Sequence, residues 1–314
     1  MPKVITLKEI KPILKNIDVI NLMQQAFIQY SNGNAVIPPV GELIFNNPPG
    51  DVHIKYGYIK REDFYVIKIA SGFYENYKLD LPSGQGMMLL FSQKTGKLES
   101  ILLDEGYLTN IRTAAAGALA VKHFSPSKIQ SIGIIGSGIQ ARLQLEYIQK
   151  NNPCKKVFIW GRNKNRIKEF YLEIKNHFDV EISSSPSDLA KKSNVIITTT
   201  ASESPLLKSD DIKSGTLIVA IGSDTENKQE LDSEILRNAD LVIGDSISQS
   251  KSRGEIFKAL SEGMINEKKI VELGTAIQNS NLNRSNNQTI VVDLTGVAVQ
   301  DIAIASKVYL KFLR

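Results

Sequence analysis

The feature that most constrains the fold of this chain is a glycine-rich turn within residues 131–141, Ser-Ile-Gly-Ile-Ile-Gly-Ser-Gly-Ile-Gln-Ala. Residues 132–135 form an apolar run typical of a buried strand, and a helix-like stretch follows the turn. Gly136 permits the tight turn, Gly138 lets the backbone approach a ligand, and Ala141 allows the helix to pack closely on the sheet. An ordinary glycine-rich turn is the alternative. The strand before and the helix after favour the G-x-G-x-x-G/A fingerprint of a dinucleotide-binding turn.

The surrounding pattern predicts the fold class. From residue 128 onward, predicted strands alternate with helical stretches, which indicates a doubly wound parallel sheet of the Rossmann type. These strands lie at 131–135, 156–160, 180–183, 194–199, 216–221, 240–244 and 289–293. Earlier strands at 51–59, 64–71, 86–92 and 98–104 follow one another without helices, which indicates a second α+β domain with a mixed or antiparallel sheet. We therefore expect residues 1–124 with 297–314 to form one domain, and residues 125–296 to form the nucleotide-binding domain.

Composition excludes several classes of protein. The chain has 314 residues, and its net charge of +5 is spread along the sequence, so no nucleic-acid partner is expected. No apolar run approaches the length of a membrane span, so no membrane partner is expected. The single cysteine, Cys154, fits a reducing cytoplasm. The three histidines, His53, His123 and His177, are far apart and lack metal-ligand spacing, so no metal site is expected.

The second strand of the Rossmann-like region indicates which dinucleotide is preferred. NAD-binding sites usually place an acidic residue about 20 residues after the first glycine, on the ribose 2′-hydroxyl. No Asp or Glu occurs between Tyr147 and Lys168, whereas Arg162, Lys164 and Arg166 cluster just after the strand. A guanidinium suits a 2′-phosphate, so NADP(H) is favoured and NAD(H) remains possible. A solvated basic turn is the alternative.

Four charged residues lie in surroundings that are costly for a charge. Lys68 lies in the apolar run Tyr65-Val66-Ile67-Lys68-Ile69-Ala70, where it is either buried with a partner or reaches water from an edge strand. Arg112 precedes a run of small residues near the start of an Ala-rich helix, where it could hold a carboxylate or lie on the surface. Asp224 and Asp293 follow predicted parallel strands, where ligands bind, although either could cap a helix instead.

Taken together, these segments resemble the ornithine cyclodeaminase/mu-crystallin family. The matching stretches run in the family's order over nearly the whole chain. They are 66–76, Thr109 to Ala116, Gly136 to Ala141, Ala220 to Asp224, and Val291 to Asp301. The resemblance implies a homodimer that pairs the sheets of its non-Rossmann domains. It also implies chemistry on α-amino or α-imino acids with a bound nicotinamide cofactor.

The resemblance also implies roles for individual residues. Lys68 and Arg112 match positions that hold the substrate carboxylate, and Asp224 matches the carboxylate that handles the proton on the substrate nitrogen. We expect Lys68 and Asp224 to be catalytic. The expected cofactor contacts are Arg112, Thr113, Gly136, Ser137, Gly138, Ile139, Gln140, Gly161, Arg162, Asn163, Arg166, Thr199, Thr200, Ile221, Gly222 and Val297.

One departure from the family pattern affects the expected reaction. Many members carry a basic residue after the first prolines, where this chain has Val40. Cyclodeaminases also carry an acidic residue on the next strand, where this chain reads Val-His-Ile-Lys at 52–55. His53 or Lys55 could supply the missing positive charge to the substrate. This departure makes ornithine cyclodeamination less expected.

The sequence therefore favours an NADPH-dependent reductase of α-imino acids, such as Δ1-pyrroline-2-carboxylate or Δ1-piperideine-2-carboxylate. Arg112 and Lys68 would hold the carboxylate, and Asp224 would manage the proton on the imine nitrogen. Two alternatives remain: an ornithine or lysine cyclodeaminase with bound NAD, and a non-catalytic, crystallin-like protein that binds NADPH.

Overall fold

The computed structural model describes residues 1–73, 75–279 and 284–314. The chain divides into two compact units: unit 1 consists of Met1–Arg112 with Val297–Arg314, and unit 2 consists of Thr113–Gly296. The first boundary lies inside the helix α3 (Tyr107–Phe124). The sequence pattern instead suggested a boundary at the end of this helix.

Unit 1 contains a seven-stranded mixed sheet in the order β1-β7-β6-β5-β4-β2, with β3 paired to β4. β1 runs parallel to β7, and the other described pairs are antiparallel. The strands are β1 (Lys3–Thr6), β2 (Ala35–Val36), β3 (Gly41–Asn46), β4 (Pro49–Ile59), β5 (Phe64–Phe73), β6 (Gly84–Ser92) and β7 (Leu98–Leu103). Because β5 is an interior strand, Lys68 cannot be an edge-strand lysine.

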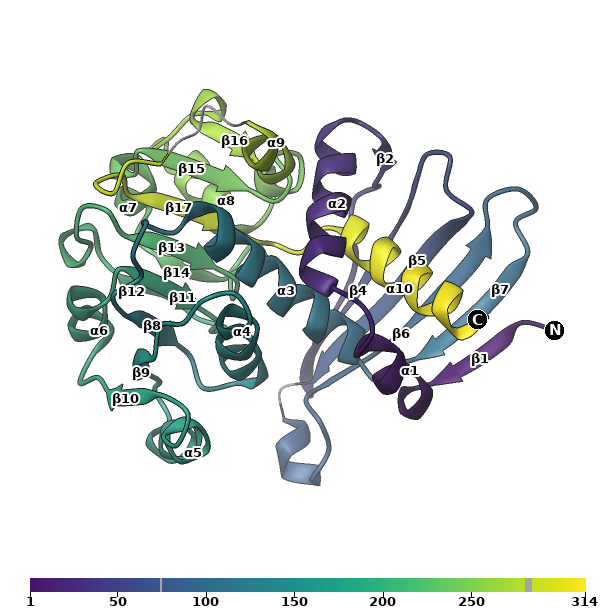
Figure 1. Ribbon diagram of the computed structural model, residues 1–314, viewed down its shortest axis with the longest axis horizontal. Helices are drawn as coiled ribbons and strands as arrows, with labels where there is room; N and C mark the ends of the chain where they lie inside the picture. Colours follow the sequence, from purple (N-terminus) through teal and green to yellow (C-terminus); the bar gives the residue numbers. More distant parts are fainter. Residues whose placement is uncertain (74, 280–283) are drawn as a thin grey trace. The chain divides into compact units, whose positions relative to one another are not determined.

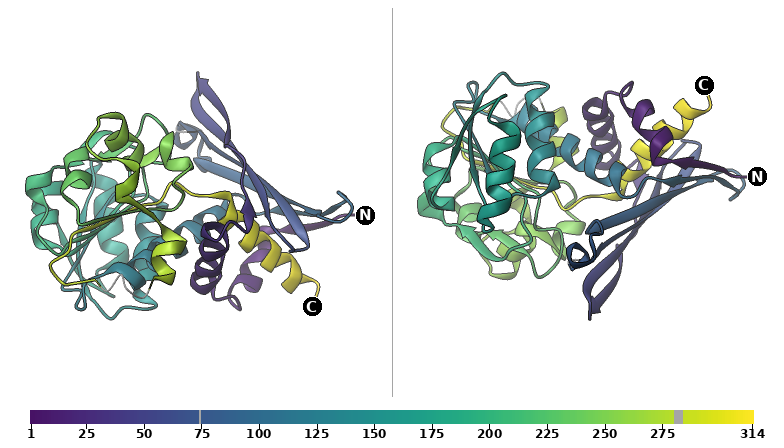
Figure 2. Two further views of the ribbon diagram at one scale, coloured as in Figure 1. Left: turned by 90° about the horizontal axis from the view of Figure 1, so that it is seen from above. Right: turned by 90° about the horizontal axis from the view of Figure 1, so that it is seen from below.

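Helices pack on one face of this sheet (Figures 1 and 2). They are α1 (Leu7–Leu14), α2 (Val19–Ser31) and α10 (Ala298–Phe312), and a short 3-10 helix, η1 (Asn76–Leu79), follows β5. The sequence specifies where the first two begin. Glu9 accepts hydrogen bonds from the backbone and hydroxyl of Thr6, and Asp18 accepts one from the backbone N–H of Asn21. α10, from the end of the chain, lies against β4 and β5.

Unit 2 is built on an eight-stranded sheet in the order β10-β9-β8-β11-β13-β17-β15-β16, and all of its described pairs are parallel. The strands are β8 (Ile132–Ile135), β9 (Lys156–Trp160), β10 (Asp179–Ile182), β11 (Val195–Thr198), β13 (Leu217–Ala220), β15 (Leu241–Gly244), β16 (Ile270–Glu272) and β17 (Ile290–Asp293). The strand order reverses between β8 and β11. In doubly wound sheets, ligands bind at the carboxyl ends of the strands at this switch point.

Helices and a small sheet complete unit 2. The α-helices are α4 (Ile139–Gln149), α5 (Lys164–Ile174), α6 (Pro186–Lys192), α7 (Ser233–Asn238), α8 (Gly254–Ser261) and α9 (Leu273–Gln278). The 3-10 helices are η2 (Ser209–Asp211), η3 (Gln249–Lys251) and η4 (Glu267–Lys269). A second, two-stranded sheet pairs β12 (Glu203–Leu207) with β14 (Gln229–Leu231). The sequence pattern did not predict β12, β14 or β16.

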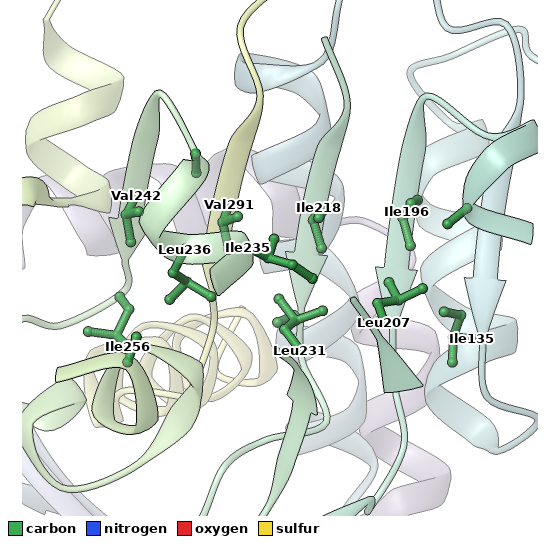
Figure 3. Packing of buried hydrophobic residues seen from close by; sticks show 14 of the residues in the cluster. Ile135, Ile196, Leu207, Ile218, Leu231, Ile235, Leu236, Val242, Ile256 and Val291 are labelled. Atoms are coloured by element: carbon green, nitrogen blue, oxygen red, sulfur yellow. The ribbon is translucent and has the colours of Figure 1, made fainter. Parts of the chain in front are cut away.

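The core of unit 2 lies between the parallel sheet and the elements that cover it (Figure 3). Ile135, Ile196 and Ile218 come from neighbouring strands and are fully buried. Leu231 of β14 and Ile256 of α8 pack against this layer, so apolar burial holds the small sheet and α8 against the parallel sheet. Both faces of the central strands are buried, which explains their continuous apolar runs.

The fold class predicted from the sequence is confirmed: an α/β protein with a Rossmann-type parallel sheet and a second, mixed-sheet unit. Within the part of the chain that the structure describes, no helix is long and apolar enough to span a bilayer.

Candidate functional site

Unit 1 buries a group of charged side chains around one carboxylate. Lys68 Nζ lies 2.9 Å from Asp301 Oδ2, and Arg112 Nε lies 3.1 Å from Asp301 Oδ1. Arg112 Nη1 also donates a hydrogen bond of 2.9 Å to Gln300 Oε1. Lys68 is only 2% exposed and Asp301 only 1%. Buried charges require such pairing, because burial without a partner is very costly.

Three different elements bring these residues together. Lys68 lies in the middle of β5, Arg112 lies in the second turn of α3, and Asp301 lies in the first turn of α10. Lys55 of β4 lies directly opposite Lys68 in the antiparallel register and is also buried. We call Lys55, Lys68, Arg112 and Asp301 the charge cluster.

Positive charge dominates the charge cluster. Burial lowers the pKa of Lys68 to about 7, and repulsion from Arg112 and Lys55 adds to this effect, while Asp301 opposes it. For Asp301, burial favours the neutral form, but Arg112 and Lys68 outweigh it and hold the pKa below its ordinary value. One carboxylate therefore faces three basic side chains, and the cluster can accept a further anion.

A second acid lies close enough to act electrostatically on the charge cluster. Asp104 precedes α3, and its Oδ2 accepts a 2.8 Å hydrogen bond from the backbone N–H of Leu108. Burial raises the pKa of Asp104 to about 6, and the charge of Lys68 partly opposes this rise. Even with Asp104 ionised, three basic groups face two carboxylates. A planar guanidinium beside an ammonium suits a ligand carboxylate.

The two predicted substitutes for the missing cation near Val40 are in different environments. Lys55 belongs to the charge cluster. The imidazole of His53 lies between two carboxylates, 3.1 Å from Glu42 Oε1 and 3.4 Å from Asp51 Oδ1. Of these two residues, Lys55 is the one whose positive charge acts on Lys68.

Unit 2 contains a hollow of about 220 Å³ at the switch point of its sheet. We call it the glycine-turn hollow. Predicted residues that line it are Gly136, Ser137, Gly138, Gly161, Arg162, Asn163, Arg166, Thr199 and Thr200. Trp160, Ala201, Ser202 and Leu206 line it as well, and the sequence pattern had not assigned them to the site. The hollow joins the ends of β8, β9 and β11, as expected for a nucleotide site.

The glycine turn is shaped by two different requirements. Gly136 has φ of +128°, and a Cβ there would lie 2.2 Å from Thr199 Oγ1, so only glycine fits between the strand ends. A Cβ on Gly138 would meet nothing within 4 Å, and Gly138 is the N-cap of α4 without a side-chain cap. Protein packing explains the first glycine. The second leaves open space at a helix N-terminus, which fits a bound phosphate.

The basic turn after β9 lies on the rim of the same hollow. Arg162 and Arg166 are exposed, and both line the hollow. The side chain of Asn163 caps α5 by accepting hydrogen bonds from the backbone N–H groups of Asn165 and Arg166. Among the described residues that line the hollow, none is acidic. A basic rim without an acidic residue suits the 2′-phosphate of NADP(H) better than the ribose 2′-hydroxyl of NAD(H), which is usually bound by a carboxylate.

Asp224 follows β13 in unit 2, and its side chain is 40% exposed. Its Oδ1 lies 2.7 Å from Lys228 Nζ, and its backbone carbonyl accepts a hydrogen bond of 3.3 Å from Arg253 Nη1. Asp224 is therefore a partly exposed, ion-paired carboxylate. Asp293, the other candidate after a strand, is fully buried and accepts a 2.9 Å hydrogen bond from the backbone N–H of Ile256, near the start of α8.

The remaining predicted cofactor residues lie outside the glycine-turn hollow. Ile139 and Gln140 begin α4, and Ile221 and Gly222 follow β13. Thr113 continues α3, and Arg112 and Val297 belong to unit 1, where Val297 is fully buried as the N-cap of α10.

Sequence reasoning missed Asp301, the acid at the centre of the charge cluster. A signal was present, because Gln300 and Asp301 interrupt the apolar pattern of the last helix, Val299 to Ile304. Two polar residues at core positions of a helix are costly unless they have partners. The same argument that singled out Lys68 would therefore have found its partner.

The fold and these two sites define a class: proteins that combine a Rossmann-type nucleotide unit with a second unit that holds buried basic side chains. A family model agrees. The chain belongs to the ornithine cyclodeaminase/mu-crystallin family, whose model matches residues 2–314.

Among its relatives, an uncharacterized cyclodeaminase of Sinorhizobium fredii is 36% identical over 310 residues, which cover 97% of this chain and 94% of the relative. The ketimine reductase mu-crystallin of Macropus fuliginosus is 30% identical over 292 residues, which cover 91% of this chain and 90% of that protein.

Two solved structures share the whole fold. The Δ1-pyrroline-2-carboxylate reductase of Thermococcus litoralis, in complex with NADH and L-proline, has a TM-score of 0.91 at 26% identity. The similarity covers 99% of this chain and 97% of that one. An archaeal alanine dehydrogenase dimer with bound NAD has a TM-score of 0.90 at 29% identity, and the similarity covers 99% and 96% of the two chains.

Proposed function

We propose that this protein is an NADPH-dependent reductase of α-imino acids of the Δ1-pyrroline-2-carboxylate or Δ1-piperideine-2-carboxylate type. The observation that carries the proposal is the charge cluster, in which Lys55, Lys68 and Arg112 surround the single carboxylate of Asp301. Its excess of buried positive charge suits the carboxylate that every α-imino acid carries. The imine reductases among its relatives support this reaction class.

The residues of unit 1 would bind and orient the substrate. Arg112 would hold both oxygens of the substrate carboxylate, and Lys68 would add a second charge-assisted hydrogen bond. Lys55 would supply the positive charge that many family members place near Val40. Fixing the carboxylate fixes the imine carbon in turn, which is the positioning contribution to catalysis.

The residues of unit 2 would hold the cofactor and manage a proton. The open space at Gly138 and the helix N-terminus behind it fit a pyrophosphate. When bound, the nicotinamide supplies the hydride. Asp224 would hydrogen-bond the imine nitrogen and hold the proton that this nitrogen requires, with its charge balanced by Lys228.

The proposal is tested by following NADPH and NADH oxidation with Δ1-pyrroline-2-carboxylate, Δ1-piperideine-2-carboxylate, and pyruvate with added amines. We expect turnover with at least one imine. No turnover with any of them, together with ammonia release from ornithine or lysine, would reject the reductase.

A cyclodeaminase is the second candidate, and the 36% identical relative from Sinorhizobium fredii favours it. It requires nucleotide that stays bound through purification and shows no net turnover. The buried, cationic Lys55 argues against it, because the cyclodeaminase pattern has an acidic residue on this strand. A non-catalytic NADPH-binding protein would need neither Lys68 nor Arg112 for its role.

The cofactor preference is tested at the rim of the glycine-turn hollow. Replacing Arg162 with Ala should weaken NADPH binding about tenfold and leave NADH binding within about twofold, because only NADPH carries the 2′-phosphate. Fluorescence titration of both nucleotides measures this. Lys168→Ala, on α5 and outside the hollow, is the control. Equal losses for the two nucleotides would contradict the assignment.

The charge of Lys68 makes a second prediction. Its pKa of about 7 means that the ammonium, which attracts a carboxylate, is lost as the pH rises above neutrality. We expect the affinity for L-proline to fall between pH 7 and pH 9, by up to about tenfold per pH unit. Calorimetric titration with nucleotide present measures it. Lys68→Met should remove the pH dependence, and a flat wild-type profile would show that Lys68 does not titrate in this range.

We also propose a homodimer formed through the sheet of unit 1. Tyr56 and Tyr58 on β4 and Met87 on β6 are exposed, as is the β3 segment Leu43 to Phe45. Exposed apolar side chains gathered on one sheet are typical of an interface. The archaeal alanine dehydrogenase is described as a dimer, which supports the proposal. Sedimentation equilibrium should give twice the mass of one chain.

A further inference from the structure

A buried acid that takes no part in the proposed chemistry contacts residues beside the glycine-turn hollow. Glu230 lies in the middle of β14 and is fully buried. Its Oε2 accepts hydrogen bonds from Thr198 Oγ1 at 2.7 Å and from the backbone N–H of Gly222 at 2.9 Å. Its Oε1 accepts from the backbone N–H of Thr200 at 2.5 Å and from the Thr200 hydroxyl at 2.7 Å.

These donors lie at the end of β11 and in the loops that follow β11 and β13, two neighbouring strands of the parallel sheet. Thr199 and Thr200 line the hollow directly, and Thr199 is the residue that a side chain on Gly136 would strike. A Cβ on Gly222 would lie 2.0 Å from the carbonyl oxygen of Thr200. The two loops are therefore in close contact, and Glu230 links them by hydrogen bonds to both.

Glu230 itself is held by another acid. Glu255 of α8 accepts a 2.7 Å hydrogen bond from the backbone N–H of Glu230 and a 3.1 Å bond from that of Leu231. The neighbouring buried titratable groups are also acids: Asp293 of β17 acts on Glu255, Glu230 acts on both of them, and Asp245, which follows β15, acts on Asp293. Two nearby bases, Lys228 and Arg253, contact Asp224.

We infer that Glu230 is a positioning residue for the dinucleotide: its ionised carboxylate, by accepting four hydrogen bonds, holds the Thr199–Thr200 turn in the shape that admits the nucleotide. The inference rests on the proposed nucleotide binding to unit 2. All four partners are donors, so a proton on Glu230 would turn one acceptor into a competing donor.

This arrangement has a consequence for pH. Burial raises the pKa of Glu230 to about 7, although its hydrogen bonds oppose the rise. Burial, with neighbouring acids, raises the pKa values of Glu255 and Asp293 well above the ordinary range. Glu230 itself changes charge near pH 7. The nucleotide, by requiring the ionised form, should bind less tightly as the pH falls below that value.

The test is direct binding of NADH between pH 6 and 8.5, measured by fluorescence, with NADH chosen because it lacks the titrating 2′-phosphate. We expect wild-type affinity to fall below pH 7, by up to about tenfold per pH unit. Glu230→Gln offers an NH2 group to the same donors, so it should bind NADH about ten- to a hundredfold more weakly, with no pH dependence. Glu234→Gln, on the exposed start of α7, is the control and should match wild type.

A second variant guards against a folding defect. Thr200→Val removes one hydroxyl donor but keeps the backbone N–H, so it should fold, weaken NADH binding several-fold and shift the pH midpoint upward. Wild-type affinity and wild-type pH dependence in folded Glu230→Gln or in Thr200→Val would overturn the inference. Failure of the wild-type protein to bind either NADH or NADPH at any pH would instead overturn the proposed function.

Discussion

Replacing Lys68 with Met is expected to lower kcat/KM for a cyclic imino acid by about a thousandfold while leaving the dissociation constant of NADH within about threefold. The loss corresponds to about 4 kcal/mol, which is within the range for removing one member of a buried, hydrogen-bonded charge pair. Methionine keeps most of the length of the side chain and removes the charge together with its hydrogen-bond donors. Steady-state kinetics and nucleotide titration on the same preparation measure the two quantities.

Two controls separate a lost contact from a lost fold. Lys94→Met changes an exposed lysine on the turn before β7 and should leave both quantities unchanged. Thermal unfolding should show Lys68→Met less stable than wild type but folded at the assay temperature, because Asp301 keeps Arg112 as a partner. A parallel fall in NADH affinity, or activity within threefold of wild type, would contradict the role given to Lys68.

Replacing Gly138 with Ala should raise the dissociation constants of NADH and NADPH at least tenfold and change the free energy of unfolding by less than about 1 kcal/mol. The added methyl group would meet no protein atom within 4 Å, and the backbone φ of −86° suits alanine. The cost can therefore arise only when a phosphate approaches the turn.

Gly136 provides the contrast. There an added Cβ would strike Thr199 Oγ1, and the φ of +128° disfavours any side chain, so Gly136→Ala should lower stability as well as nucleotide affinity. Chemical denaturation and nucleotide titration of both variants distinguish the two cases. If Gly138→Ala bound nucleotide normally, the pyrophosphate would have to lie elsewhere.

The parallel sheet of unit 2 was predictable because each of its main strands is marked by a pattern within a short stretch of sequence. Buried parallel strands are continuous apolar runs, and the turn after residue 135 carries its own glycine signature. β14 was not predictable in the same way. It is only three residues long, and its central residue, Glu230, is a buried acid that backbone and hydroxyl donors from distant segments satisfy.

The residues of the candidate site also divide into those with a local sequence signal and those that depend on distant segments. Lys68 and Arg112 could be singled out because a charge among apolar or small neighbours is costly. Their shared partner lies 189 residues beyond Arg112, and no local pattern links residues so far apart. The division of the chain inside α3 has no local signal either, since a continuous helix shows no break in its apolar spacing at that point.

The position of Asp301 in the last helix has a consequence for the order in which the chain can fold during synthesis. Unit 2 is continuous in sequence, whereas unit 1 is completed only by residues 297–314. Until those residues leave the ribosome, Lys68 and Arg112 lack their shared counter-charge, and burying them is unfavourable. We therefore expect unit 2 to fold first and unit 1 to fold only after the C-terminal helix α10 has been synthesised. Truncation before α10 should leave a protein in which only unit 2 is folded.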